Sequence, residues 1–220
     1  MALKTIAYTK KGKINKSDNS NAYLVKKEAE EVPILGYGDS SHDWTTIEEK
    51  GVIAVFEAVG NGDGNLQTAY VAAKELGVSY AWDDFVERNL RDVNSRLFGQ
   101  LMAAVVYIDN TNVVTALNVG NVMVMLLRDG NTEEVCRINK YIMGDSVKLK
   151  CRTSFRMLRN GDVLLVLNSG MFEVLYDDIL KAAKFECAKE KVEYLNRKLK
   201  VHEQMYAYMN DSTIVMVYEG

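Results

Sequence analysis

The feature that most constrains the fold is a stretch rich in valine, leucine and methionine, residues 101–138, that turn residues interrupt. The interruptions read DNTN (109–112), NVGN (118–121) and RDGN (128–131). Asn, Asp and Gly adopt the backbone conformations of tight turns, so apolar runs separated by them favour antiparallel strands joined end to end. The segment therefore predicts a meander of three or four antiparallel strands.

Strands are expected before and after this meander, and a pair of helices is expected on each side of it. Period-two or continuous apolar patterns predict strands at residues 3–8, 22–25, 52–56, 162–167 and 212–218, with a further strand around 146–151. Apolar residues at helical spacing predict helices at residues 66–76, 82–97, 179–185 and 192–199. This order predicts an α+β fold, a four-layer α-β-β-α sandwich of two antiparallel sheets flanked by helix pairs.

One long stretch, residues 26–50, has little pattern and is expected to be a surface excursion, either loop or short strand. Because loops on a rigid scaffold commonly carry recognition, residues 28–50 are candidates for contact with a partner. Asp39, His42 and Asp43, with Ser40 and Ser41 between them, lie close together there and suggest a hydrolase. A nucleophile, its base and an orienting group are rarely crowded into five residues, however, so we assign them no catalytic role.

The composition and charge of the chain exclude several classes of protein. A chain of 220 residues with 48% hydrophobic and 26% charged residues predicts one globular domain, 1–220, and excludes a disordered or fibrous chain. The formal net charge is only -3 and basic residues are spread along the sequence, so no nucleic-acid partner is expected. No apolar run approaches the roughly 20 residues that span a bilayer, and MALKTIAYTKKGK lacks a secretory apolar segment. We expect a cytoplasmic protein without a membrane partner.

Five segments, taken in order, resemble the motifs of one enzyme family. KSDNSNAYLV (16–25) resembles R-x-x-N-E-D-A-F, and GVIAVFEAVGN (51–61) resembles a strand that ends in VFDGHGG or VADGMGG. ALNVGNVMVMLLRDG (116–130) resembles an A-N-x-G-D-S-R hairpin that ends in an Arg-Asp-Gly turn. GDVLLVLNSGMFEVL (161–175) resembles GDxLLLCSDGLxDxL, and NDSTIVMVYE (210–219) resembles the terminal DNxTxxxV strand. The family is that of the metal-dependent serine/threonine phosphatases of type 2C (PPM), and the resemblance covers nearly the whole chain.

The resemblance implies a phosphatase 2C-like fold and a metal-dependent chemistry. Members of the family hold two divalent cations, usually magnesium or manganese, between acidic side chains, and the metals activate a water that attacks the phosphoryl group. Such cations prefer oxygen ligands, and their affinity depends on the number of carboxylates. The residues of this chain at the metal and neighbouring positions of the motifs are Asn21, Glu57, Ala58, Asn121, Ser169 and Asn210, with Lys16 at the phosphate-binding arginine.

Of the four family carboxylates that approach the metals, only one remains, as Glu57. Each lost carboxylate removes on the order of 4 kcal/mol of gross attraction per unit charge pair at an effective dielectric constant near 20. We therefore expect no catalytic residues, no metal and no other cofactor. The leading interpretation is a catalytically inactive domain, a pseudophosphatase, that acts in signalling as a protein-binding or regulatory module. The expected partner is a protein, phosphorylated or unmodified.

Two alternatives remain open. The first is a weak metal-dependent serine/threonine phosphatase with a remodelled site, in which Glu57 holds Mg or Mn together with Asp63 or Asp211. Asp63 lies in GNGDG, a composition that is also typical of any strand-to-helix loop. Asp211 follows the terminal family position by one residue, and such a shift directs a strand side chain to the opposite face.

The second alternative is an unrelated adaptor whose turns only imitate the motifs. The arrangement of the motif residues in space distinguishes it from the family fold. If the resemblance is correct, Asn21, Glu57, Ser169 and Asn210 should converge on one cleft between the two sheets.

Overall fold

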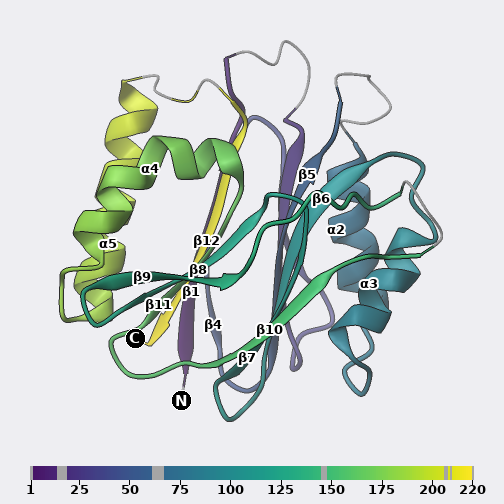
Figure 1. The fold of residues 1–220 in the computed structure, drawn as a ribbon, viewed down its shortest axis with the longest axis horizontal. Coiled ribbons are helices and arrows are strands. Elements are labelled where there is room, and N and C mark those ends of the chain that lie inside the picture. The colour runs from purple at the N-terminus through teal and green to yellow at the C-terminus, as the bar shows by residue number, and fades with distance from the viewer. Residues whose placement is uncertain are drawn as a thin grey trace.

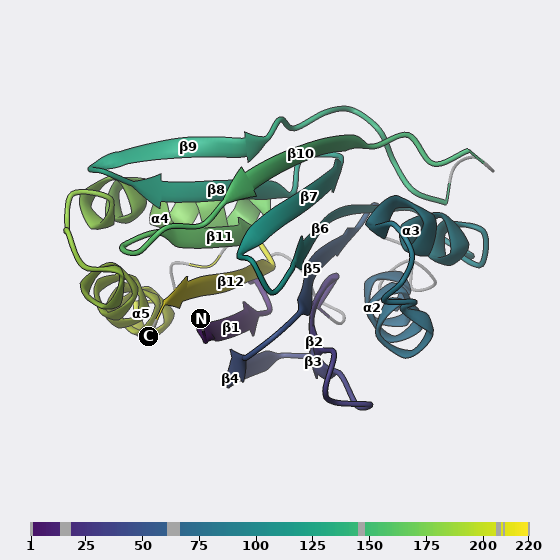
Figure 2. The same cartoon turned by 90° about the horizontal axis from the view of Figure 1, so that it is seen from below.

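The computed structural model describes residues 2–13, 19–60, 67–144, 148–205, 208 and 210–219. Two six-stranded antiparallel sheets pack face to face (Figures 1 and 2). The first sheet has the order β4-β1-β12-β11-β8-β9, and the second has the order β10-β7-β6-β5-β2-β3. Helices α4 and α5 lie against the first sheet, and helices α2 and α3 lie against the second (Figure 1). The predicted α-β-β-α sandwich is confirmed.

The strands of the first sheet are β1 (Leu3–Lys10), β4 (Ser40–Ile47), β8 (Met123–Arg128), β9 (Asn131–Cys136), β11 (Val163–Leu167) and β12 (Ser212–Glu219). Those of the second are β2 (Asn21–Lys27), β3 (Ile34–Gly36), β5 (Gly51–Ala58), β6 (Leu101–Ile108), β7 (Val113–Val119) and β10 (Arg152–Met157). The helices are α2 (Thr68–Ser79), α3 (Val86–Asn94), α4 (Ser169–Ala182) and α5 (Ala188–Gln204). None of them combines the length and the hydrophobicity that crossing a bilayer requires.

Three apolar clusters hold the layers together. Along each strand alternate side chains point to opposite faces of the sheet. Val25 of β2, Val55 of β5 and Val166 of β11 therefore lie in a central core between the sheets. Their chain neighbours, such as Leu24 and Phe56, instead pack in the core that faces α2 and α3. A third core joins the first sheet to α4 and α5.

The predicted meander consists of two hairpins, one in each sheet. Strands β6 and β7 pair in the second sheet, whereas β8 and β9 pair in the first. The interruption at NVGN carries the chain from one sheet to the other, so β7 and β8 do not pair. Each interruption contains a left-handed residue, Asn112 (φ 62°), Gly120 (φ 89°) or Asp129 (φ 49°), as the turn chemistry predicts.

Three element predictions need correction. No strand forms at 148–151, and 145–147 lie outside the described residues; Leu149 packs in the core facing α2 and α3, and strand β10 begins only at Arg152. The excursion at 26–50 contains β3 and the full-length strand β4, which pairs with β1 over all eight residues. Helix α4 begins at Ser169, well before residue 179, because the Asn168 side chain caps it by accepting from the Met171 amide.

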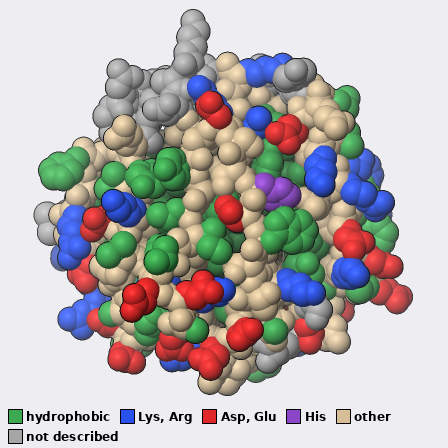
Figure 3. Space-filling view, turned by 180° about the vertical axis from the view of Figure 1, so that it is seen from behind, with side chains coloured by type: hydrophobic (Ala, Val, Ile, Leu, Met, Phe, Trp, Pro, Cys, Tyr) green, Lys and Arg blue, Asp and Glu red, His purple; other side chains and the backbone are tan. Residues whose placement is uncertain are grey.

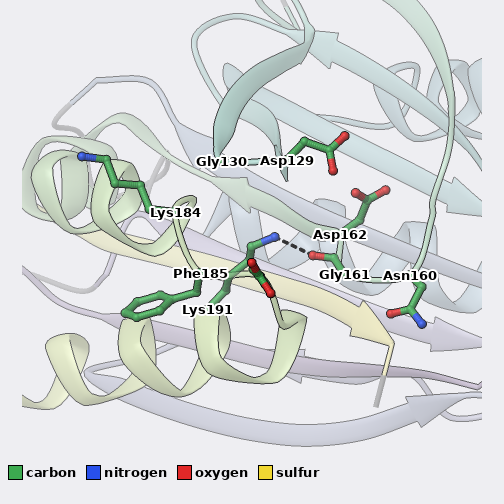
Figure 4. A pocket seen from close by; sticks show the side chains of 9 residues that line it. Asp129, Gly130, Asn160, Gly161, Asp162, Lys184, Phe185 and Lys191 are labelled. Atoms are coloured by element: carbon green, nitrogen blue, oxygen red, sulfur yellow. Dashed lines mark hydrogen bonds between the residues drawn. The ribbon is translucent and has the colours of Figure 1, made fainter.

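The β8–β9 turn is held to the turn before β11 by hydrogen bonds. Arg128 Nε donates to Asp162 Oδ1 at 3.0 Å, and the Asp162 carboxylate, 4% exposed, also accepts from the Arg159 amide at 2.7 Å. Beside it lies a cavity of about 380 Å³, at whose wall the buried Lys191 of α5 donates to the Gly161 carbonyl oxygen at 2.6 Å (Figure 4). These contacts fix α5 and the β8–β9 turn to the start of β11.

Replacing Asp162 with asparagine should lower the free energy of unfolding by on the order of 3 kcal/mol, because the substitution leaves the Arg128 guanidinium without its buried counter-charge. Urea denaturation of the native protein and of Asp162→Asn measures the difference. Asp129→Asn, which neutralises an exposed carboxylate in the facing turn, is the matched control and should cost less than about 1 kcal/mol. If both variants lost the same free energy of unfolding, the buried Arg128–Asp162 ion pair would not stabilise the fold.

Candidate functional site

Two of the motif positions lie side by side in the second sheet. Asn21 at the start of β2 is directly opposite Glu57 near the end of β5. Tyr23 of β2 and Val55 of β5, each two residues away, belong to the central core between the sheets. Because the side-chain period is two, Asn21 and Glu57 face that same space at its end. The Asn21 side chain is 1% exposed, and among the described residues neither its amide nitrogen nor its amide oxygen has a hydrogen-bond partner.

The first sheet contributes the residues that follow β11 and precede β12. The Asn168 amide nitrogen donates to the Asp211 carbonyl oxygen at 2.8 Å, and its amide oxygen accepts from the Thr213 backbone at 2.9 Å. Gly170 approaches the same segment so closely that a β carbon on it would stand 3.1 Å from Asn210 Cβ. Ser169, half-buried between Asn168 and Gly170, therefore adjoins the segment that contains Asn210.

Glu57 joins the two halves of the site. Burial raises the pKa of the Glu57 carboxyl to about 7; a hydrogen bond with the Asn168 side chain opposes the rise, and the charges of Asp211 and Glu173 add to it. One carboxyl oxygen of Glu57 is buried without a hydrogen-bond partner in the part of the chain that the structure describes. Asn21 and Glu57 of the second sheet thus lie at the same end of the sandwich as Asn168 and the segment that contains Asn210.

Asp211 faces the site, and the orientation expected from the one-residue shift is wrong. Its side chain is 3% exposed, whereas the side chain of Asn210 is exposed. The Asp211 carboxylate accepts from the Gly12 amide at 2.8 Å and from the Ser20 amide and hydroxyl, each at 2.6 Å. Since Asp211 precedes the first residue of β12, the amino-terminal segment, not the ladder of the strand, determines its direction.

The remaining predicted positions have varied environments. Ala58 is buried against the core that faces α2 and α3, and Asn121 has a buried amide oxygen to which no described residue donates. Lys16 and Asp63 lie outside the described residues. His42 and Asp43 follow one another in β4, so their side chains point to opposite faces, which argues against the hydrolase grouping.

Sequence reasoning missed a network of neutral side chains around the site. The hydroxyls of Thr9 and Thr213 hydrogen-bond at 2.6 Å, and the Asn19 amide donates to Thr9 Oγ1 at 2.9 Å. Asn19 also accepts from the Asn21 backbone at 2.9 Å. The signal available in the sequence was the helix-capping preference of Asn168, which stands just before an apolar helical pattern. Nothing comparable marks Thr9 or Thr213, whose roles depend on strand pairing.

The layer order and the site at the end of the two sheets define the fold of type 2C serine/threonine phosphatases, and comparison with solved structures supports this assignment. RsbX in complex with magnesium superposes with a TM-score of 0.71 at 17% sequence identity, covering 98% of this chain and 94% of that one. The S. agalactiae serine/threonine phosphatase gives 0.70 at 13% identity, covering 99% and 100%. A protein of the bacterial stressosome gives 0.65 at 19%, covering 98% of each chain.

The sequence itself matches no protein-family model and no curated protein. At identities this low, the structural likeness establishes the fold, and the chemistry must be argued from the site.

The donor set does not fit the pair of divalent cations that this fold holds in its metal-dependent members. Asn21, Ser169 and Asn210 offer neutral oxygens, and burial favours the uncharged form of Glu57. The Asp211 carboxylate already accepts three hydrogen bonds. In the part of the chain that the structure describes, no group of three or more His, Cys, Asp or Glu side chains could hold a metal ion. Amide and hydroxyl oxygens replace the ligand atoms without replacing their charge.

The raised pKa of Glu57 gives a prediction for stability against pH. The folded protein keeps the Glu57 proton up to about pH 7, whereas the unfolded chain loses it near 4.5, the ordinary pKa of a glutamate. Between these values the folded state binds more protons, so the free energy of unfolding falls as pH rises through this window and stays low above it. Glu57→Gln removes this loss, and at about pH 8 the variant should be more stable than the native protein by on the order of 3 kcal/mol.

Urea denaturation at about pH 4 and pH 8 measures the effect, and the two proteins should differ little at the lower pH, where Glu57 is protonated in both states. Glu49→Gln, which removes an exposed carboxyl from the β4–β5 turn, serves as the control. If the free energies of unfolding of the native protein and of Glu57→Gln change equally between the two pH values, burial does not raise the pKa of Glu57.

Proposed function

We propose that this chain is a catalytically inactive domain of the type 2C phosphatase fold, a pseudophosphatase that acts as a protein-binding or regulatory module in signalling. The observation that carries the proposal is the replacement of the acidic metal positions by Asn21, Ser169 and Asn210, with one buried carboxyl left at Glu57. A metal-activated water needs cations held by charged ligands, and this site supplies little charge. The partner is a protein, phosphorylated or unmodified.

The state of Glu57 supports the proposal further. With a pKa of about 7, roughly half of the Glu57 carboxyls carry a proton at neutral pH, so a cation must displace a proton to bind there. The neutral network of Thr9, Asn19 and Thr213 supports the site without any ion. A regulatory role also agrees with the structural neighbour from the stressosome, a system described as adapted to control secondary messenger signalling.

The second candidate is a weak metal-dependent serine/threonine phosphatase that uses Mg or Mn. It is favoured by the inward direction of Asp211, whose charge acts on Glu57 and so brings two carboxyl groups to one site. Asp63, the other candidate ligand, lies outside the described residues. The cytoplasmic location and the absence of nucleic-acid and membrane partners stay predictions.

Calorimetric titration with Mg²⁺ and Mn²⁺, combined with hydrolysis of p-nitrophenyl phosphate, separates the two candidates. We expect no saturable heat and no turnover above the uncatalysed rate in the native protein, because the site lacks the charge that holds two cations. Saturable binding and turnover that are both lost in Glu57→Ala would refute the proposal and establish the weak enzyme.

A variant that restores aspartate at positions 21, 57, 169 and 210 tests the residue assignments. It should gain measurable Mn²⁺ affinity, since it again offers four carboxylates at one end of the sandwich. A control with aspartate at the exposed Asn131 and Asn160 adds charge elsewhere on the surface and should bind no better than the native protein.

A further inference from the structure

The two sheets have four edge strands, and three of them are protected. Edge strands present unpaired backbone groups, which proteins shorten, cover or charge to prevent unwanted pairing. Strand β3 has only 3 residues. Strands β9 and β10, on opposite sheets, are tied together by the Arg156–Glu133 ion pair at 2.5 Å and by Cys136 Sγ, which donates to the Arg152 carbonyl at 3.3 Å. Strand β4, with 8 residues, is the remaining edge, and it contains neither lysine nor proline.

The hydrogen-bonding pattern shows which groups of β4 are free. The Lys11 amide donates to the Asp39 carbonyl at 3.0 Å, and these two residues continue the β1–β4 register one place beyond Lys10 and Ser40. In an antiparallel ladder bonded pairs recur at every second residue, so the odd-numbered residues of β4 bond to β1. The backbone groups that point away from β1 belong to Ser40, His42, Trp44 and Thr46, and none of them has a partner among the described residues.

The side chains of these same residues face outward. Trp44 is 58% exposed, and its ring packs against the His42 ring with centroids 5.6 Å apart. The odd-numbered side chains point inward. There Tyr23 of β2 donates a hydrogen bond to Asp43, and this contact ties β4 of the first sheet to the second sheet. Figure 2 shows β4 at the margin of the sandwich. The edge of β4 and its outer face around Trp44 are therefore available to a partner, whereas His42 also packs against Tyr8 with ring centroids 5.9 Å apart.

The end of β4 nearest Ile47 is acidic. Glu48 and Glu49 follow the strand, both are exposed, and neither makes an ion pair within the part of the chain described. The neighbouring β2–β3 turn is joined to this end by the Lys50–Glu28 ion pair at 2.8 Å. On the face opposite to that of Figure 1, acidic side chains gather toward the lower rim (Figure 3). This charge favours a basic segment.

We propose that β4 is a docking strand to which an extended segment of a partner protein adds, extending the six-stranded first sheet by one strand. Backbone hydrogen bonds to the free groups of β4 provide affinity, and alternate side chains provide specificity. The segment carries lysine or arginine near Glu48 and Glu49 and an apolar or aromatic side chain on Trp44. The inference rests on the proposed function only in that it names the surface through which a binding module acts.

A second copy of this chain is a poorer occupant of the same edge. Antiparallel pairing of two β4 strands about Trp44 sets the free even-numbered residues of the two copies opposite one another. It brings Glu49 of one copy opposite Asp39 of the other, and like charges across a strand pair are destabilising. A basic extended segment meets no such repulsion.

The probe is a fluorescein-labelled ten-residue peptide of alternating valine and threonine with two lysines at one end, made with the lysines at either terminus. We expect its anisotropy to rise on titration with the native protein, and the amide resonances of Ser40, His42, Trp44 and Thr46 to shift and gain protection from exchange. Methylation of alternate peptide nitrogens should lower the affinity at least about tenfold, because it removes the backbone donors.

Two substitutions at one position isolate the free edge. Thr46→Pro and Thr46→Ala both remove the threonine side chain, but only proline removes the unpaired N–H, whose loss a native edge tolerates. We expect Thr46→Pro to weaken peptide binding about tenfold and Thr46→Ala to leave it nearly unchanged. Replacing Glu48 and Glu49 by lysine should reverse the preference toward a peptide with glutamates at its end.

Several results would overturn the proposal. These are no binding by either lysine peptide, equal binding of the N-methylated peptide, or protection of the β4 amides in a concentration-dependent dimer, which would assign the edge to a second copy. The N-methylated comparison uses the native protein, so it remains decisive if Thr46→Pro does not fold. Metal-dependent phosphatase activity would refute the proposed function and leave docking at β4 untouched, so the two failures are distinguishable.

Discussion

The structure depends on the packing of two sheets through side chains that point inward at every second residue. This alternation puts Val25, Val55 and Val166 into one central core. It also determines where the strand ends point, because a residue two places beyond a core residue continues the same face. Asn21, Glu57 and Asn168 each stand in that relation to a core residue, so they meet although they are far apart in the sequence. The geometry of the site is a consequence of the core.

Polar side chains at the end of an apolar core are partly buried, so any charge among them is costly. Carboxylates gathered at such a place repel one another and lose hydration, and bound cations offset both costs in a metal-dependent enzyme. Without the cations, amides and hydroxyls that bond to one another are the stable solution, as Thr9, Asn19 and Thr213 illustrate. Two carboxyl groups are exceptions: Asp211 accepts hydrogen bonds from Gly12 and Ser20, whereas burial raises the pKa of Glu57 to about 7. Asn121 is a further example, because a neutral side chain stands there at a motif position that is acidic in the family.

Turn chemistry and periodicity were sufficient to predict the layers, since the Asn, Asp and Gly interruptions and the helical stripes are local signals. They failed where pairing decides the structure. The sequence of strand β4 is polar and shows no strand pattern. Its inward residue Asp43 is accommodated by a hydrogen bond from Tyr23, a contact that forms only in the folded chain. Asp211 faces inward because Gly12 and Ser20 bind its carboxylate from almost 200 positions away. Residue identity at the site was readable from the motifs; burial and direction were not.

The docking strand and the depleted site are connected through one side chain. Tyr23, fully buried, donates its hydroxyl to Asp43 and shares a hydrogen bond of 2.8 Å with Ser41, so it anchors β4 from inside the sandwich. Two residues before it in β2, on the same face, lies Asn21. A sheet edge held this firmly is preorganised for an extended partner, and ordering it costs little entropy on binding. Such recognition needs the rigid sandwich but none of the chemistry at its end.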